Sequence, residues 1–184
     1  EDEGVIDEKE SDVIENMLNL DNIKVSEVLT PRSVVFALDE NMSVKEVIAK
    51  EDAIFKFSRI PVYNESIEDV TGLVLTKKLF KQALTDDSVS LKSVKKDIFA
   101  INENVPVSKA LDLFIAKKEH MFLVKDNYDQ TEGILTLEDC VETILGVEIM
   151  DESDTTADMR ELAKRKMKLK RKLEEAKANK QKSK

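Results

Sequence analysis

The sequence is poor in several residue types, and their scarcity limits the fold. Its 184 residues include one cysteine, no tryptophan, four glycines and three prolines, and aromatic residues make up 5%. The single cysteine, Cys140, excludes an internal disulfide framework and fits a reducing compartment. The scarcity of Gly and Pro argues against a loop-rich, all-β or collagen-like chain.

Two further absences concern membranes and processing. No apolar run approaches the roughly 20 residues that a membrane-spanning helix needs, and the start of the chain shows no signal peptide. Because the sequence begins at Glu1 rather than at a methionine, we expect it to be a piece of a longer protein.

Charged residues are plentiful and unevenly distributed. The net charge is −9, from 29 Lys and Arg against 38 Asp and Glu. Residues 159–184, here called the basic tail, contain twelve Lys or Arg and three Glu, so the tail carries +9 and the body before it −18. Because an acidic body repels phosphates over most of its surface, we predict no nucleic-acid partner.

An internal repeat runs through residues 23–146. A step of 61 residues leads from Arg59–Tyr63 to His120–Val124 and from Gly72–Leu75 to Gly133–Thr136, each time from one short apolar segment to another. Each repeat is predicted to contain a strand, a helix, two strands and a helix, with helices at 43–50, 77–84, 107–118 and 137–145. One repeat of about 60 residues buries too little apolar surface to be stable alone. The sequence therefore predicts a duplicated α+β domain.

The repeat sets the predicted domain organisation: an acidic linker helix at 1–22, a first repeat at 23–88, a second at 89–148, and an acidic linker with the basic tail at 149–184. The linker helix is expected from Asp7 to Leu20, with a capping-box-like start at Asp7 and Glu10. Its apolar residues share one face, which must lie against the following domain or a partner: Val13, Ile14, Met17 and Leu18.

The basic tail has an imperfect heptad pattern. Met159, Leu162, Leu169 and Leu173 recur at heptad spacing, but Lys166 stands at a core position. About three heptads with one defect are marginal in isolation, so a solvated terminal helix is favoured over a coiled coil. Three acidic residues lie just before the tail: Asp151, Glu152 and Asp154. They could attract Mg²⁺ or form a solvated acidic linker. The solvated linker is favoured, because Mg²⁺ binds weakly to flexible carboxylates.

The segment Gly133–Asp139 carries the most specific chemical pattern. A buried strand runs into a helix that begins at Thr136, and a helix N-terminus favours an anion such as phosphate. Asp139, one turn later, can accept hydrogen bonds from two ribose hydroxyls. The same pair also resembles an ordinary capping box. The matching positions in the first repeat are Leu75 and Lys78, which indicates one competent nucleotide site and one that is lost or altered.

Two other reactive side chains occur once each. His120 occupies the repeat position of Arg59, so a phosphate-facing role is weighed against a surface residue. Cys140 lies in an apolar helical row, which favours an inert, buried thiol. One His and one Cys cannot form a zinc site. Because no nucleophile–base pair or metal cluster appears, we predict that the chain is not an enzyme.

The duplicated unit and the Gly-x-x-Thr-x-x-Asp pattern resemble a pair of cystathionine-β-synthase (CBS) domains, a Bateman module. Four segments resemble the CorC/HlyC and cyclin-M (CNNM) family of magnesium transporters: Val28–Arg32, Ser58–Tyr63, Gly133–Asp139 and Glu148–Asp154. The resemblance covers residues 4–154. It implies an α+β tandem CBS-domain pair of two β-α-β-β-α repeats, with an N-terminal helix and a C-terminal basic helical tail.

The resemblance also implies a function: a regulatory domain that binds an adenine nucleotide, ATP or AMP with Mg²⁺ accompanying ATP, and controls an attached membrane magnesium or divalent-cation transporter. A transmembrane domain would precede it, it would form a homodimer, and it would lie on the cytoplasmic side of a bacterial inner or plasma membrane. The alternative is a ligand-free dimerisation module. The basic tail has three possible environments: it could contact an anionic membrane surface, fold back on the acidic body, or stay in solvent.

Carried over position by position, the resemblance assigns six residues to the nucleotide. Thr30 and Pro61 would line the adenine side, and Phe57 would lie beside the base. The phosphates and the ribose would be held by Arg59, Thr136 and Asp139. No residue would bind a metal directly, because Mg²⁺ would arrive with the nucleotide.

Overall fold

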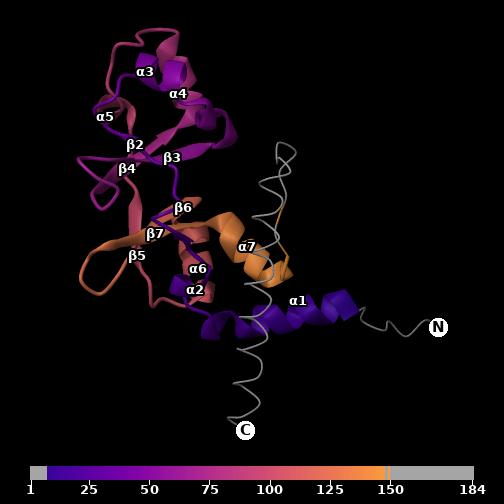
Figure 1. Cartoon of the computed structure of the whole chain (residues 1–184). Coiled ribbons are helices and arrows are strands. Elements are labelled where there is room, and N and C mark those ends of the chain that lie inside the picture. The colour runs from indigo at the N-terminus through magenta and orange to yellow at the C-terminus, as the bar shows by residue number, and fades with distance from the viewer. Residues whose placement is uncertain (1–7, 148, 150–184) are drawn as a thin grey trace, which may run out of the picture. The chain divides into compact units, whose positions relative to one another are not determined.

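The computed structural model describes residues 8–147 and 149, so Asp7, the acidic linker from Asp151 and the basic tail lie outside it. The chain divides into two compact units. Unit 1 contains the residues up to Leu29, Glu103–His120 and the residues from Leu135, whereas unit 2 contains Thr30–Asn102 and Met121–Ile134. Each unit therefore takes segments from both sequence repeats (Figure 1).

Unit 1 is built from helices. They are α1 (Glu8–Asn19), the 3-10 helix η1 (Leu20–Asn22), α2 (Val25–Val28), α6 (Val107–Lys117) and α7 (Leu137–Leu145). The observed bounds of α7 are those predicted, and α6 ends one residue early. Helix α7 ends at Gly146, whose φ of 67° lies in the left-handed region that glycine adopts without strain. The core of this unit is formed by fully buried side chains: Val25, Val107, Ala110, Phe114, Leu135 and Cys140.

Unit 2 contains a three-stranded sheet of order β2-β3-β4, formed by Leu38–Asp39, Arg59–Tyr63 and Val70–Leu75. Strands β2 and β3 are parallel, and β3 and β4 are antiparallel. Its helical elements are α3 (Val44–Lys50), η2 (Asp52–Lys56), α4 (Thr76–Ala83) and α5 (Leu91–Val94). Alternate strand residues and one face of each helix form an aliphatic core, as the periodicities predict: Leu38, Val44, Val47, Ile54, Ile60, Val62, Val74, Leu79 and Leu91.

A second sheet has the order β1-β7-β6-β5, formed by Thr30–Pro31, Thr131–Thr136, Met121–Lys125 and Phe99–Asn102. Strands β5 and β6 are parallel, with Phe99 opposite Phe122, whereas β1 runs antiparallel to β7, with Thr30 opposite Ile134. The mixture of helices with two mixed sheets confirms the predicted α+β fold.

The two repeats exchange their leading segments. In unit 2 the N–H of Leu91, at the start of α5, donates to the carbonyl of Met42 in the first repeat at 2.9 Å. In unit 1 the N–H of Val25, at the start of α2, donates to the carbonyl of Val105 in the second repeat, also at 2.9 Å. Each short helix thus completes the other repeat, which explains why the compact units do not follow the order of the sequence.

The repeat alignment needs one correction. The carbonyl of Ser58 accepts from the N–H of Thr76, and the carbonyl of His120 accepts from the N–H of Leu137, both at 3.1 Å. His120 therefore matches Ser58 rather than Arg59, so the prediction that it occupies the position of Arg59 is wrong. The cause is one extra residue in the turn between β3 and β4. The N–H of Asn64 donates to the carbonyl of Asp69, five residues on, whereas in the second repeat the N–H of Asp126 donates to the carbonyl of Gln130, four residues on.

Candidate functional site

The start of α7 brings together the two residues that the Gly-x-x-Thr-x-x-Asp pattern singles out. Thr136 ends β7 and is the N-cap of α7, with extended backbone angles of −108° and 162°. Its N–H and its hydroxyl both donate to Asp139 Oδ2, at 2.7 and 2.8 Å. The N–H of Asp139 donates back to Thr136 Oγ1 at 3.1 Å. Both side chains are half-buried.

These bonds form a capping box, which is the second of the two interpretations offered by the sequence. A capping role and a ligand-binding role can coincide, because an ionised carboxylate can accept several hydrogen bonds at once. The box also fixes the rotamers of Thr136 and Asp139. A hydroxyl, a carboxylate and the positive end of the α7 dipole are therefore held within one helical turn.

The matching helix of the first repeat starts differently. The N-cap of α4 is Leu75, no side chain caps this helix, and its first turn contains no acidic residue. Lys78, which replaces Asp139 in this repeat, is exposed. The Thr76 hydroxyl donates instead to the carbonyl of Phe57. The predicted asymmetry between the two repeats is therefore present in the local structure.

The other four predicted residues lie in unit 2. Thr30 belongs to β1, and Arg59 and Pro61 belong to β3, where Arg59 is half-buried and Pro61 is buried. Phe57 precedes β3, is partly exposed, and stacks on Phe36 with ring centroids 5.5 Å apart. The structure thus brings Thr136 and Asp139 into direct contact in unit 1, and it holds Arg59 and Pro61 on one strand of unit 2. The sequence did not identify Phe36, since nothing local marks it as the stacking partner.

Pro61 occupies the central strand of its sheet, where the missing N–H of proline is usually unfavourable. Its partner across the antiparallel pair is Leu73. The backbone N–H and carbonyl of Leu73 form their hydrogen bonds with Lys96 rather than with Pro61. The N–H of Leu73 donates to the carbonyl of Lys96, and the N–H of Lys96 donates to that of Leu73, both at 2.9 Å. Pro61 therefore takes no hydrogen bond from this pair, and its ring lies on the face of the sheet opposite the core residues Ile60 and Val62.

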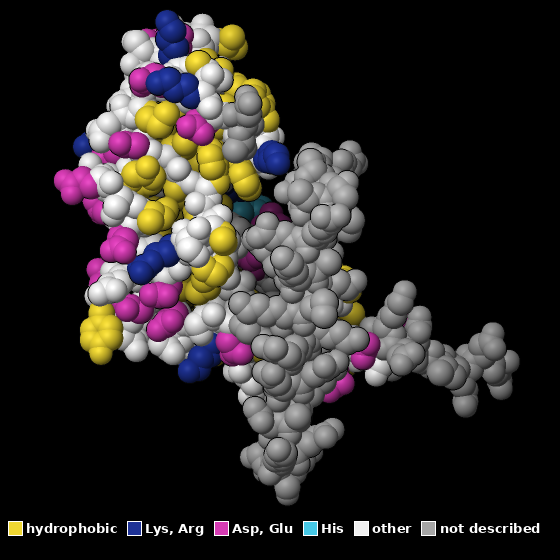
Figure 2. Space-filling view, viewed as in Figure 1, with side chains coloured by type: hydrophobic (Ala, Val, Ile, Leu, Met, Phe, Trp, Pro, Cys, Tyr) yellow, Lys and Arg dark blue, Asp and Glu magenta, His cyan; other side chains and the backbone are white. Residues whose placement is uncertain are grey.

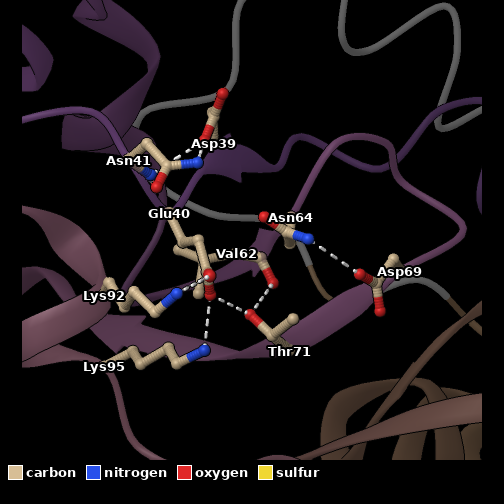
Figure 3. A network of polar contacts seen from close by, with 9 residues as sticks. All are labelled: Asp39, Glu40, Asn41, Val62, Asn64, Asp69, Thr71, Lys92 and Lys95. Carbon is tan, nitrogen blue, oxygen red and sulfur yellow. Dashed lines mark hydrogen bonds and ion pairs between the residues drawn. The ribbon is translucent and has the colours of Figure 1, made fainter.

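A buried carboxylate next to β2 was not predicted. Glu40 lies almost fully inside unit 2, and Oε2 accepts hydrogen bonds from Lys95 Nζ and Thr71 Oγ1, each at 2.5 Å. Lys92 Nζ lies 3.1 Å from Oε1 (Figure 3). The hydrogen bond from Lys95 and then that from Thr71 lower the pKa of Glu40 from 4.5 to about 2. The network ties the end of β2 to β4 and to the region of α5, so its role in the described structure is to join the exchanged segment to the first repeat.

The single cysteine is buried as expected. Burial, and then the neighbouring Asp139 and Glu138, raise the pKa of the Cys140 thiol to about 12. Within residues 8–147 and 149, no group of three or more His, Cys, Asp or Glu side chains is placed to hold a metal ion. Over the same residues, no helix combines the length and the hydropathy needed to cross a bilayer.

The fold and its duplicated unit define a pair of CBS domains. A family model of the CBS domain matches residues 91–146. A solved structure described as the CBS domain of the bacterial CNNM/CorC family Mg²⁺ transporter in complex with ATP is 30% identical, with a TM-score of 0.70, and the match covers 77% of this chain and 99% of that one. The chain therefore belongs to the CBS domains of the CNNM/CorC family.

Curated proteins from plants and bacteria also match. A DUF21 domain-containing protein of Arabidopsis thaliana, described as putative and chloroplastic, is 33% identical over 160 residues, which are 85% of this chain and 24% of the relative. The magnesium and cobalt efflux protein CorC of Escherichia coli is 29% identical over 158 residues, which are 84% of this chain and 53% of CorC. The chain thus spans about a quarter of the plant protein's length and about half of that of CorC.

Proposed function

We propose that this chain is a regulatory domain that binds one adenine nucleotide and controls an attached membrane transporter of magnesium or another divalent cation. The observation that carries the proposal is the placement of a hydroxyl and a carboxylate together at the N-terminus of α7, which the first repeat lacks. The similarity to a CBS domain described in complex with ATP supports the choice of ligand.

Each proposed contact follows from the chemistry of the side chain. Asp139 accepts hydrogen bonds from ribose hydroxyls, and the Thr136 hydroxyl with the first N–H groups of α7 receives a phosphate. Arg59 offers guanidinium donors to further phosphates. Phe57 and Pro61 present apolar surface to the adenine, with Thr30 as a polar group at its edge. Mg²⁺ bound to ATP supplies charge that offsets the repulsion between a polyphosphate and an acidic body.

Control of the transporter requires that the nucleotide prefers one state of the domain. A ligand shifts an equilibrium only by the difference between its affinities for the two states. The transmembrane domain would precede α1 in the full-length protein, the CBS pair would form a homodimer, and the domain would lie on the cytoplasmic side of the membrane. The matches to longer relatives support a further domain, because this chain covers only 53% of CorC.

A ligand-free dimerisation module is the second candidate. The capping box favours it, since helix capping alone gives Thr136 and Asp139 a structural role. The two candidates make different predictions for a substitution that keeps the cap and moves the carboxylate. Glu at the third helical position still forms a capping box, but its carboxylate is displaced by one methylene. Asp139→Glu therefore separates capping from ligand binding.

The experiment is isothermal titration of the chain with ATP and AMP, with and without Mg²⁺. Asp139→Ala removes two charge-assisted hydrogen bonds worth roughly 1.5–3 kcal/mol each, so we expect the affinity to fall at least about tenfold. Asp139→Glu should also lose affinity while its unfolding free energy stays near that of the parent. Lys78→Ala, at the matching position of the first repeat, is the control and should bind like the parent.

Three results are decisive. One nucleotide per monomer, with the loss confined to the Asp139 variants, supports the proposal. Absence of heat with every nucleotide identifies the ligand-free module instead. Binding that survives Asp139→Ala would place the nucleotide elsewhere and refute the assignment of this site.

A further inference from the structure

Helix α1 of unit 1 buries polar side chains and exposes large apolar ones, the reverse of a normal surface helix. It buries two asparagines, Asn16 and Asn19, each only 4% exposed. Its large apolar side chains are exposed instead: Ile14 by 48%, Met17 by 56% and Leu18 by 68%. These three residues recur at i, i+3 and i+4, so they form one continuous stripe. A helix normally turns such a stripe toward a core.

The neighbour of α1 in unit 1 does not cover this stripe. Asn16 faces α7, where its Nδ2 donates to the carbonyl of Ile144 at 3.1 Å. Of the four apolar residues expected to lie against the following domain or a partner, only Val13 is half-buried. Among the described residues, the domain therefore does not provide the cover that the sequence requires.

Apolar exposure continues where the chain leaves α7. Leu145, Val147 and Ile149 are each more than two-fifths exposed. The N–H of Ile149 donates to Glu142 Oε1 at 2.9 Å, which holds this residue beside α7. The basic tail begins ten residues after Ile149. An intervening linker of nine residues can span up to roughly 30 Å, whereas the twelve residues of α1 measure about 18 Å. The tail can therefore reach any point of α1.

The charges of α1 and of the basic tail are complementary. Helix α1 contains Glu8, Glu10, Asp12 and Glu15 against one lysine, and it has no basic residue in its last turn. The tail carries +9, with Met159, Leu162, Leu169 and Leu173 at heptad spacing. The basic residues of the tail thus complement the acidic residues of α1, and its apolar residues complement the exposed apolar stripe.

We propose that the basic tail docks on the exposed face of α1 in the same chain, with its apolar residues against Ile14, Met17 and Leu18 and its Lys and Arg beside the acidic residues. A tether this short gives an effective concentration in the millimolar range, so modest contacts suffice. The docked tail covers the stripe of the helix that leads into the CBS pair.

The other occupants match this face less well. A second copy that placed its own α1 on this face would bring an equally acidic helix against the first, and like charges resist such contact. An anionic membrane would be repelled by the same carboxylates. The basic tail is the segment of this chain that carries a large opposite charge.

The first test uses trypsin, for which the tail offers twelve Lys or Arg. Met17→Gln with Leu18→Gln removes the apolar contact without adding a cleavage site. We expect the initial cleavage rate of the tail to rise by at least about tenfold. Burial of either side chain in the docked state contributes enough free energy to change the docking equilibrium by about that factor. Leu84→Gln is the matched control, since Leu84 is 88% exposed on unit 2, and it should leave the rate unchanged. Equal rates in all chains would overturn the proposal.

The second test locates the contact by disulfide formation. Met17→Cys combined with Leu169→Cys should oxidise to a disulfide within one chain, at a rate independent of protein concentration, while Cys140 stays buried. Leu84→Cys with Leu169→Cys should not. A disulfide between two chains would assign the face to a second copy. Sedimentation of the chain with phosphatidylserine vesicles, together with equal trypsin rates, would assign the tail to a membrane. Either result refutes the proposal.

Discussion

Gly72 gives a sharp test of the exchange between the repeats. This residue lies in β4, where Leu73 forms its two backbone hydrogen bonds to Lys96. A Cβ added to Gly72 would lie 2.5 Å from the carbonyl oxygen of Lys96, closer than real Cβ atoms approach. The obstacle is a backbone atom of the exchanged segment, so a side-chain rotation cannot relieve it. Gly72→Ala must therefore displace Lys96 or the strand.

The expected loss of stability in Gly72→Ala follows from the displacement of Lys96. Displacing Lys96 weakens two backbone hydrogen bonds, each worth about 0.5–1.5 kcal/mol, and overpacking a buried site costs about 1–3 kcal/mol. A loss of about 2–4 kcal/mol in the unfolding free energy is expected. Without the contact, Gly→Ala would instead stabilise the chain by about 0.4–1 kcal/mol, because alanine restricts the unfolded state. The sign of the change in unfolding free energy therefore shows whether the Lys96 carbonyl lies this close to Gly72.

The measurement is urea denaturation of parent and variant without nucleotide, monitored by far-UV circular dichroism. Gly146→Ala is a useful comparison, because the φ of 67° at Gly146 by itself disfavours a side chain. It should cost only about 1–2 kcal/mol. A Gly72→Ala variant as stable as the parent, or more stable, would show that Lys96 does not approach β4 this closely.

Three further predictions concern other contacts. Because the folded pKa of Glu40 is about 2 against an ordinary 4.5, its ion pairs stabilise the fold above pH 4.5 and are lost as the pH falls toward 2. Acid titration of Glu40→Gln should accordingly show a weaker dependence of stability on pH over that window than the parent shows. The Cys140 thiol, buried and with its pKa raised to about 12, should react with a thiol reagent only after denaturation, and rapid reaction of the native chain would contradict this. Arg32 Nη1 donates to the carbonyl of Thr131 at 2.7 Å and Nη2 lies 3.6 Å from Glu68, so Arg32→Ala should lower the unfolding free energy by about 1–2 kcal/mol in the same urea assay.

The sequence predicted the parts of the fold that local pattern controls. Apolar periodicity located α6 and α7 within one residue, and the glycine-led strands gave the correct 61-residue step between β4 and β7. The family was predicted correctly from the order and spacing of short motifs, and the comparisons confirm it.

Other features depend on contacts that no local pattern records. The pairing of Lys96 with Leu73, and of Pro31 with Gly133, joins segments whose sequences do not identify each other. The buried state of Glu40 could not be read from its position after a short strand, because its partner Lys95 lies 55 residues away. The extra residue in the turn after β3 misled the alignment of His120, since one inserted residue leaves hydropathy unchanged.

The surface of unit 2 shows how far composition alone can mislead. Apolar side chains gather over the region of α3 and α4 (Figure 2). Phe55 of η2 is largely exposed, yet its ring stacks on Phe80 of α4 with centroids 5.5 Å apart. An exposed ring that stacks on a partly buried one differs from the stripe of α1, whose residues lie on the side opposite the buried asparagines. Exposure therefore indicates a missing partner only after the contacts within the chain are accounted for.

The start of α4 bears on the meaning of the pair at α7. If Thr136 and Asp139 served only to cap a helix, the fold should need an equivalent cap in the first repeat. Yet α4 forms with Leu75 at its N-cap, without a side-chain cap and with Lys77 and Lys78 in its first turn. Capping is therefore dispensable for a helix in this position, where packing of Leu79 holds the helix on its core. A polar pair that the architecture does not require favours a second use. That use is the one tested by Asp139→Glu, which retains the cap and moves the carboxylate away from a ribose.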